Sequence, residues 1–177
     1  MKWFRNLFGG EEMAALAVGK IAPDFSLEGL DGKKFQLREA LDRGPVVLAF
    51  FKVSCPTCQY TFPFLERLYQ AYRDRNVTLV GVSQNVKKDS ATFARQFGVT
   101  FPILLDDTHT YPVSNAYGLT NVPTIFWIAQ DSEIEVSSVG WVKSDFEKIN
   151  RDMAERSKAA PAVVFQAGED VRDFRAG

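Results

Sequence analysis

Cys55 and Cys58, the only two cysteines of the chain, stand in CxxC spacing directly after the apolar run 45–51. Two thiols one helical turn apart can close a disulfide without large movement of the backbone. The end of a buried strand leaves such a pair accessible, and one isolated pair is not a scaffold of structural disulfides. The dithiol therefore predicts redox chemistry.

Pro56 assigns different roles to the two cysteines. Proline favours the first position of a helix and holds the preceding residue in extended geometry, so Cys55 is the expected N-cap residue. A Cys55 thiolate would face the free amides of Thr57 and Cys58 and the positive end of the helix dipole. We predict Cys55 as the nucleophile and Cys58, which lies on the apolar face of the helix, as the thiol that resolves a mixed disulfide.

Two strands and a helix must position this dithiol. The runs 45–51 and 77–82 are apolar, and a stretch with helical spacing of its apolar residues separates them. This layout predicts a βαβ unit with both strands buried in a parallel sheet. Pro63 lies inside the predicted helix, where the missing backbone donor predicts a kink.

The remaining chain up to residue 157 alternates further predicted strands and helices. Asp31 and Gly32 favour a tight turn, so we expect a hairpin over 21–37. Ser144 and Glu147 form a capping-box pattern at the start of a final helix. The other predicted elements are a helix at 89–97, a strand at 103–105, and an antiparallel pair at 124–129 and 134–139.

Length and composition indicate one domain with two extensions. We expect an N-terminal extension at 1–20, a domain at 21–157 and a C-terminal tail at 158–177, which is either disordered or docked onto the domain. The formal charge of -1 gives no nucleic-acid signature. No apolar run reaches the length of a membrane span, and glycine and glutamate interrupt the stretch that a signal peptide needs, so we expect a cytoplasmic protein without stable membrane insertion.

Several coupled features resemble the thioredoxin-fold redoxins of the AhpC/TSA and TlpA-like group over residues 21–154. These features are CxxC after a buried strand, Pro63, the sequence Val122-Pro123-Thr124 before a strand, and Gly140 after a hairpin. The resemblance implies an α/β, thioredoxin-like fold in which helices flank a central mixed sheet. It also implies an N-terminal hairpin and an insertion after the first βαβ unit.

By the same resemblance, Pro123 is expected to be a cis proline whose loop lies beside the dithiol. Val122 would then offer its backbone to an extended substrate, and we assign substrate contacts to Pro56, Thr57, Val122 and Pro123. This expected cis isomer is an exception to the general preference of peptide bonds for trans.

The chain also departs from thioredoxins near the dithiol. Ser54 stands where tryptophan usually precedes the first cysteine, and Ala49 stands where a buried acid is usual. Without that carboxylate we assign no internal proton relay, so water or the substrate would carry the proton of Cys58. Lys52 either supports the Cys55 thiolate or is a solvated lysine at a strand end, and Glu66 is expected to be a surface charge.

Three other interpretations of the dithiol were compared with redox exchange. A zinc site needs further ligands, and the one histidine, His109, lies in a predicted loop where a solvated side chain is expected. Peroxiredoxins place proline and threonine or serine where Leu48 and Lys52 precede Cys55, so a thiol peroxidase is a weaker alternative. A redox-sensing interaction module with slow turnover stays open, because a fold does not fix function.

The sequence therefore predicts a thiol-disulfide oxidoreductase without a bound cofactor or metal. Its expected partners are a disulfide-containing protein or small-molecule substrate and an external thiol that donates electrons. The direction of electron flow depends on the reduction potential of the dithiol relative to that of its compartment. In the cytosol we expect the chain to reduce its substrates.

Overall fold

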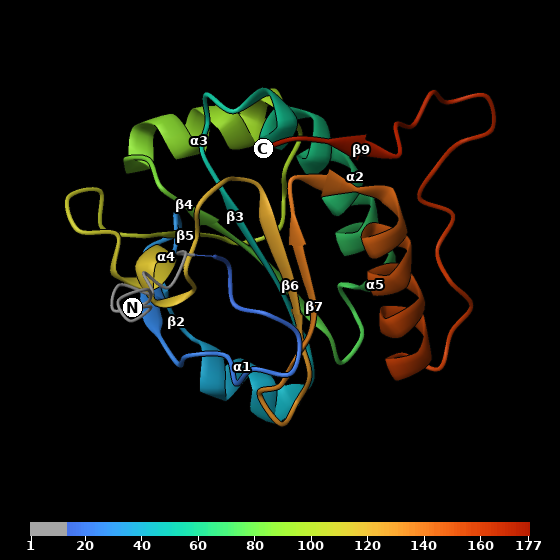
Figure 1. Cartoon of the computed structure of the whole chain (residues 1–177), viewed down its shortest axis with the longest axis horizontal. Coiled ribbons are helices and arrows are strands. Elements are labelled where there is room, and N and C mark those ends of the chain that lie inside the picture. Colours follow the sequence, from blue (N-terminus) through green and yellow to red (C-terminus); the bar gives the residue numbers. More distant parts are fainter. Residues whose placement is uncertain (1–13) are drawn as a thin grey trace, which may run out of the picture.

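The computed structural model describes residues 14–177 and contains the predicted mixed sheet (Figure 1). The central strand, β3 (Val46–Phe51), pairs in parallel with β4 (Thr78–Ser83) and antiparallel with β6 (Thr124–Ile128). All six residues of β3 are buried, which explains why its sequence is apolar throughout rather than alternating. In spatial order the strands are β5 (Ile103–Leu105), β4 (Thr78–Ser83), β3 (Val46–Phe51), β6 (Thr124–Ile128) and β7 (Ile134–Val139).

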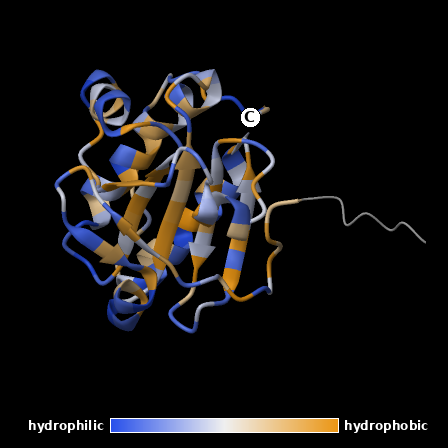
Figure 2. Cartoon of the chain, turned by 90° about the vertical axis from the view of Figure 1, so that its left-hand side faces the viewer, coloured by the Kyte–Doolittle hydropathy of each residue, from blue (hydrophilic) through white to orange (hydrophobic). Residues whose placement is uncertain are grey.

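Successive side chains of β3 point to opposite faces of the sheet and enter two separate cores. Val47, Ala49 and Phe51 pack with residues of α2 (Pro56–Tyr72), α3 (Lys87–Gln96) and α5 (Lys143–Arg156). The alternate residues Val46, Leu48 and Phe50 pack with residues of α1 (Leu37–Arg43) and α4 (Pro112–Ala116). Figure 2 shows the hydrophobic strands between these layers. Burial on both faces fixes the sheet that carries the dithiol.

The predicted N-terminal hairpin is confirmed. Strands β1 (Ser26–Glu28) and β2 (Lys34–Gln36) pair antiparallel around the Asp31-Gly32 turn. The backbone N–H of Lys33 donates to the Asp31 carboxylate at 3.0 Å, and Gly32 has a φ of 78°, which glycine adopts without a steric penalty. The insertion between the βαβ unit and β6 consists of α3, β5 and α4.

The predicted capping box at the last helix is wrong. Helix α5 begins at Lys143, and its N-cap is Val142, whose side chain makes no capping hydrogen bond. Val142 instead belongs to β8 (Trp141–Val142), which pairs with β9 (Phe174–Arg175), so the strand leads directly into the helix. The Lys143 amide donates to the Asp173 carbonyl at 2.9 Å, so a backbone group takes over the role expected of a serine cap.

Segment 158–177 is docked, which is one of the two alternatives that the sequence left open. Val164 is buried, and Phe165 packs against Trp141 and Phe146 with ring centroids 6.2 and 5.7 Å apart. An ion pair between Arg67 and Glu169 adds two hydrogen bonds of 2.8 and 2.9 Å. In Figure 1 the segment passes outside α5 and returns as β9 beside the start of α2.

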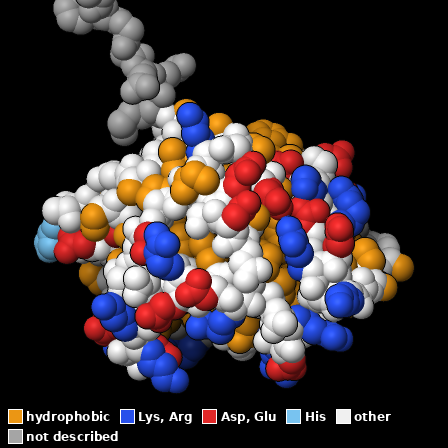
Figure 3. All heavy atoms as spheres, turned by 90° about the horizontal axis from the view of Figure 1, so that it is seen from below, with side chains coloured by type: hydrophobic (Ala, Val, Ile, Leu, Met, Phe, Trp, Pro, Cys, Tyr) orange, Lys and Arg blue, Asp and Glu red, His pale blue; other side chains and the backbone are white. Residues whose placement is uncertain are grey.

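Most of the predicted N-terminal extension, residues 1–13, lies outside the described residues. From residue 14 onward, no helix is both long and apolar enough to cross a membrane. Figure 3 shows basic and acidic side chains interspersed over one face, without a large area of a single sign.

Candidate active site

The dithiol lies at the junction of β3 and α2, where the sequence predicted it. Cys55 is the N-cap residue of α2 in extended conformation (φ -81°, ψ 116°), and Pro56 is the first residue of the helix and is exposed. The Cys55 Sγ accepts a hydrogen bond from the backbone N–H of Cys58 at 3.2 Å. A donor at the helix N-terminus stabilises negative charge, so this position suits a thiolate.

The two cysteines differ in exposure. Cys58 is fully buried in the core between α2 and the sheet, whereas Cys55 is half-buried at its edge. The pKa of the Cys58 thiol is raised far above its ordinary value. Burial is the largest cause, and the hydrogen bond with Cys55 is a smaller one. The Cys58 thiol therefore favours its protonated form, and Cys55 is the more exposed of the two cysteines.

The loop before β6 lies against Cys55. The Val122–Pro123 peptide is cis, as expected from the resemblance. The Cys55 thiol donates to the Val122 carbonyl at 3.2 Å, with Val122 half-buried and Pro123 buried. Pairing of Phe50 with Thr124 brings the start of β6 beside the end of β3 and explains how residues so distant in the sequence meet.

Thr57 lies in the first turn of α2 and is buried. Its hydroxyl donates a hydrogen bond to the Ala176 carbonyl at 2.6 Å. A group that was expected to contact the substrate therefore has a hydrogen-bond partner within the chain. Gly177 lies against Val122, and the Asn121 side chain donates to the Gly177 oxygen at 3.4 Å. The sequence gives no sign that residues 176 and 177 lie beside the dithiol, because they are far from it along the chain.

The exposure and hydrogen bonds of Lys52, Ala49 and Glu66 indicate structural roles for these residues. Lys52 is exposed, and its backbone carbonyl accepts from the Cys55 N–H at 3.2 Å. Ala49 is fully buried, so the apolar position predicted from the sequence is part of the core. Glu66 accepts a hydrogen bond from the Thr100 N–H at 2.7 Å and ties α2 to the chain before β5. None of these groups supplies a carboxylate to Cys58.

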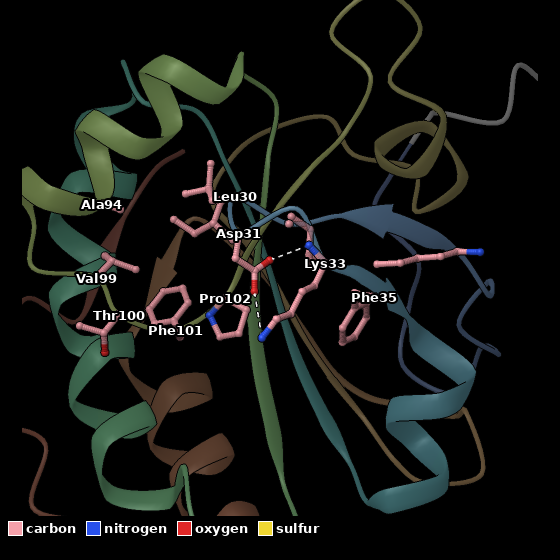
Figure 4. Close-up of a pocket in the computed structure, with 13 residues that line it drawn as sticks. Leu30, Asp31, Lys33, Phe35, Ala94, Val99, Thr100, Phe101 and Pro102 are labelled. Atoms are coloured by element: carbon pink, nitrogen blue, oxygen red, sulfur yellow. Dashed lines mark hydrogen bonds and ion pairs between the residues drawn. The ribbon is translucent and has the colours of Figure 1, made fainter.

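Two cavities lie beside the sheet, and neither is lined by Cys55 or Cys58. The smaller one is lined by Lys52 and Val122, which both contact Cys55. A polar cavity of about 200 Å³ is bounded by Lys52, Gln84, Asn115 and Val122, among others. A larger cavity of about 520 Å³ lies between the hairpin turn and the chain around Phe101 (Figure 4). Within residues 14–177, no group of three or more histidine, cysteine or acidic side chains is placed to hold a metal ion.

Comparison with known proteins agrees with this geometry. The family model described as the AhpC/TSA family matches residues 18–137. The thiol-disulfide oxidoreductase ResA of Geobacillus thermodenitrificans is 35% identical over 133 residues, which cover 75% of this chain and 74% of that protein. ResA of Geobacillus kaustophilus is 35% identical over 147 residues, which cover 82% of each protein.

Solved structures share the fold. The thioredoxin domain of a thiol-disulfide oxidoreductase from Bacteroides vulgatus superposes with a TM-score of 0.69 at 21% identity, covering 78% of this chain and 98% of that domain. A thiol:disulfide interchange protein from Bacteroides sp. superposes with a TM-score of 0.68 at 22% identity, covering 82% and 93% of the two chains. The chain therefore belongs to the AhpC/TSA family, and its dithiol is that of a thiol-disulfide oxidoreductase with a thioredoxin-like fold.

Proposed function

We propose that the chain reduces substrate disulfides by two successive exchanges in which Cys55 attacks and Cys58 resolves. The observation that carries this assignment is the contrast between the two sulfurs. The Cys55 Sγ is half-buried at a helix N-terminus and accepts the Cys58 N–H at 3.2 Å, whereas the Cys58 thiol is fully buried with a raised pKa.

The first exchange forms one disulfide and breaks another. The Cys55 thiolate attacks one sulfur of the substrate, forms a mixed disulfide with it, and releases the other substrate sulfur as a thiolate. Cys58 then gives up its proton and attacks the Cys55 sulfur, which releases the second substrate thiolate. The substrate gains two electrons and two protons, and the chain is left with a Cys55–Cys58 disulfide.

The proton of Cys58 needs an acceptor, because burial keeps this thiol protonated. Ala49 occupies the position at which a buried carboxylate would serve, and it offers no base. The first exchange releases a substrate thiolate close to the dithiol, just before Cys58 must lose its proton. This thiolate is a base, and it can take the proton directly or through water. Resolution is therefore proposed to depend on the basicity of the leaving thiol.

Val122 is the proposed docking point for the substrate backbone. Its carbonyl accepts from the Cys55 thiol at 3.2 Å and loses this donor when the thiolate forms. The freed carbonyl can then accept an N–H of an extended substrate, with Pro56, Thr57 and Pro123 as the remaining proposed contacts.

An external thiol of the reducing compartment is the proposed electron donor that returns the Cys55–Cys58 disulfide to the dithiol. Reduction of partners is favoured when the reduction potential of the dithiol lies below that of the substrate. A cytoplasmic location, proposed from the sequence, would supply such a donor, and cell fractionation with detection of the chain tests it.

A disulfide-reductase assay of the wild type, Cys55→Ser and Cys58→Ser tests the assignment. We expect no turnover in Cys55→Ser and a single, unresolved exchange in Cys58→Ser. Turnover that survives in Cys55→Ser would contradict the roles. Consumption of hydrogen peroxide should be slow in all three proteins, whereas rapid consumption by the wild type would indicate a thiol peroxidase. Oxidation of the dithiol without turnover would indicate a redox sensor.

A further inference from the structure

We propose that residues 174–177, the strap, determine the size of substrate that the dithiol accepts. The strap contacts Thr57 and Val122 beside Cys55, and Cys55 is only half-buried while the strap is docked. Small hydrophilic disulfides therefore reach Cys55 directly, whereas a protein chain must first displace the strap. This inference rests on the proposed function, because it concerns access to the same dithiol.

The strap occupies the groups that a protein substrate would use. The Thr57 hydroxyl donates to the Ala176 carbonyl at 2.6 Å. Gly177 lies so close to Val122 that a Cβ on this glycine would stand 2.4 Å from the Val122 oxygen. An extended substrate that pairs with the Val122 backbone would need the same space, so the strap and a protein substrate exclude each other.

The strap is held by backbone and side-chain contacts outside the dithiol. Strand β9 pairs with β8 through Trp141 and Val142, and the Arg175 guanidinium lies 4.6 Å from the centre of the Tyr60 ring. Gly140 has a φ of 77°, and a Cβ there would stand 2.5 Å from the Arg175 oxygen. A residue with a side chain at position 140 would therefore push the strap away.

The same contacts are few enough to be broken. Strand β9 has two residues, and the Phe174 side chain is 61% exposed, so little apolar surface is buried by the strap itself. The firm attachment of segment 158–177 lies earlier, at Val164 and at the ion pair between Arg67 and Glu169. Residues 174–177 can therefore leave the site while the segment before them stays docked.

A polar cavity lies next to the dithiol, because Lys52 and Val122, which contact Cys55, are part of its wall. It has a volume of about 200 Å³, and Lys52, Gln84 and Asn121 contribute polar groups to its wall. This volume admits a small molecule and not a folded chain. These polar side chains, of which Lys52 and Asn121 are exposed, can hydrogen-bond a hydrophilic disulfide.

Two probes of different size test the inference: hydroxyethyl disulfide and insulin, each reduced with the same thiol donor. We compare the wild type with a variant that lacks residues 174–177. If about nine in ten molecules have the strap over the site, its removal raises kcat/KM for insulin about tenfold. The reason is that the apparent affinity for insulin is proportional to the fraction of molecules whose site is uncovered. We expect less than about a twofold change for hydroxyethyl disulfide, since its route does not cross the strap.

A matched pair of arginine variants tests the same point without a deletion. Arg175→Ala removes the contact with Tyr60, whereas Arg172→Ala makes the same charge change at an exposed residue whose backbone makes its contacts. We expect a smaller rise in insulin reduction for Arg175→Ala and none for Arg172→Ala. This pair decides the question if the deletion variant does not fold.

Insulin reduction that is unchanged both in the deletion variant and in Arg175→Ala would overturn the role of the strap. Equal increases for both probes would also overturn it, because the strap would then cover the site without regard to size. Failure of the proposed function gives a different result: the wild type would reduce neither probe.

Discussion

Docking of segment 158–177 makes a quantitative prediction at Phe165. Its ring lies 5.4 Å from Phe64 and 5.7 Å from Phe146 between centroids, and it is half-buried. Replacing a fully buried phenylalanine by alanine costs about 3–5 kcal/mol, so a half-buried ring should cost about 2 kcal/mol. Phe165→Ala should therefore lower the free energy of unfolding by ~2 kcal/mol, or the melting temperature by roughly 4–8 °C for a chain of this size.

Urea unfolding followed by tryptophan fluorescence measures this effect. Val163→Ala is the matched control, because Val163 is 90% exposed on the same segment and its truncation should change stability by less than about 0.5 kcal/mol. The dependence of the free energy on urea should stay the same in both variants. Equal stabilities of Phe165→Ala and Val163→Ala would refute the conclusion that segment 158–177 is docked onto the domain through Phe165.

Three further outcomes follow from buried and paired groups. Asp106 is buried and accepts from the Ser114 N–H at 2.8 Å and the Ser114 hydroxyl at 2.7 Å, so Asp106→Ala should cost about 2–3 kcal/mol in urea unfolding, and a loss below ~0.5 kcal/mol would contradict this. Iodoacetamide at neutral pH should modify Cys55 in the native protein and reach Cys58 only after unfolding, as mass spectrometry would show, because burial raises the pKa of Cys58. Arg67 lowers the pKa of Glu169 to about 2 from an ordinary value of 4.5, so their pairing stabilises the fold above that ordinary value and is lost as pH falls toward 2. Glu169→Gln should therefore lose less stability than the wild type between pH 5 and 2 in urea titrations, and parallel curves would argue against the pairing.

The βαβ unit and the position of the dithiol were predictable because local signals determine them. Buried strands require apolar residues at every position, and Pro56 marks the start of a helix whatever its tertiary surroundings. The turn at Asp31 and Gly32 is likewise determined by residues adjacent in the sequence.

The docked segment was not predictable in the same way. Phe174 and Arg175 form a strand only because Trp141 and Val142 offer a free edge, and two residues are too few for a periodic pattern. The same pairing shifted the start of α5 to Lys143 and made the capping-box prediction wrong. Contacts between distant parts of the chain therefore decided both features, and with them the position of residues 176 and 177 at the site.

The identity of the attacking sulfur is tested most directly by trapping the mixed disulfide. Cys58→Ser and Cys55→Ser are each incubated with a disulfide substrate, and the adduct is located by mass spectrometry of peptides. We predict a stable adduct on Cys55 in Cys58→Ser, because the resolving thiol is missing, and no adduct on Cys58 in Cys55→Ser, because that thiol is buried and protonated. An adduct that forms on Cys58 as fast as on Cys55 would contradict the proposed mechanism.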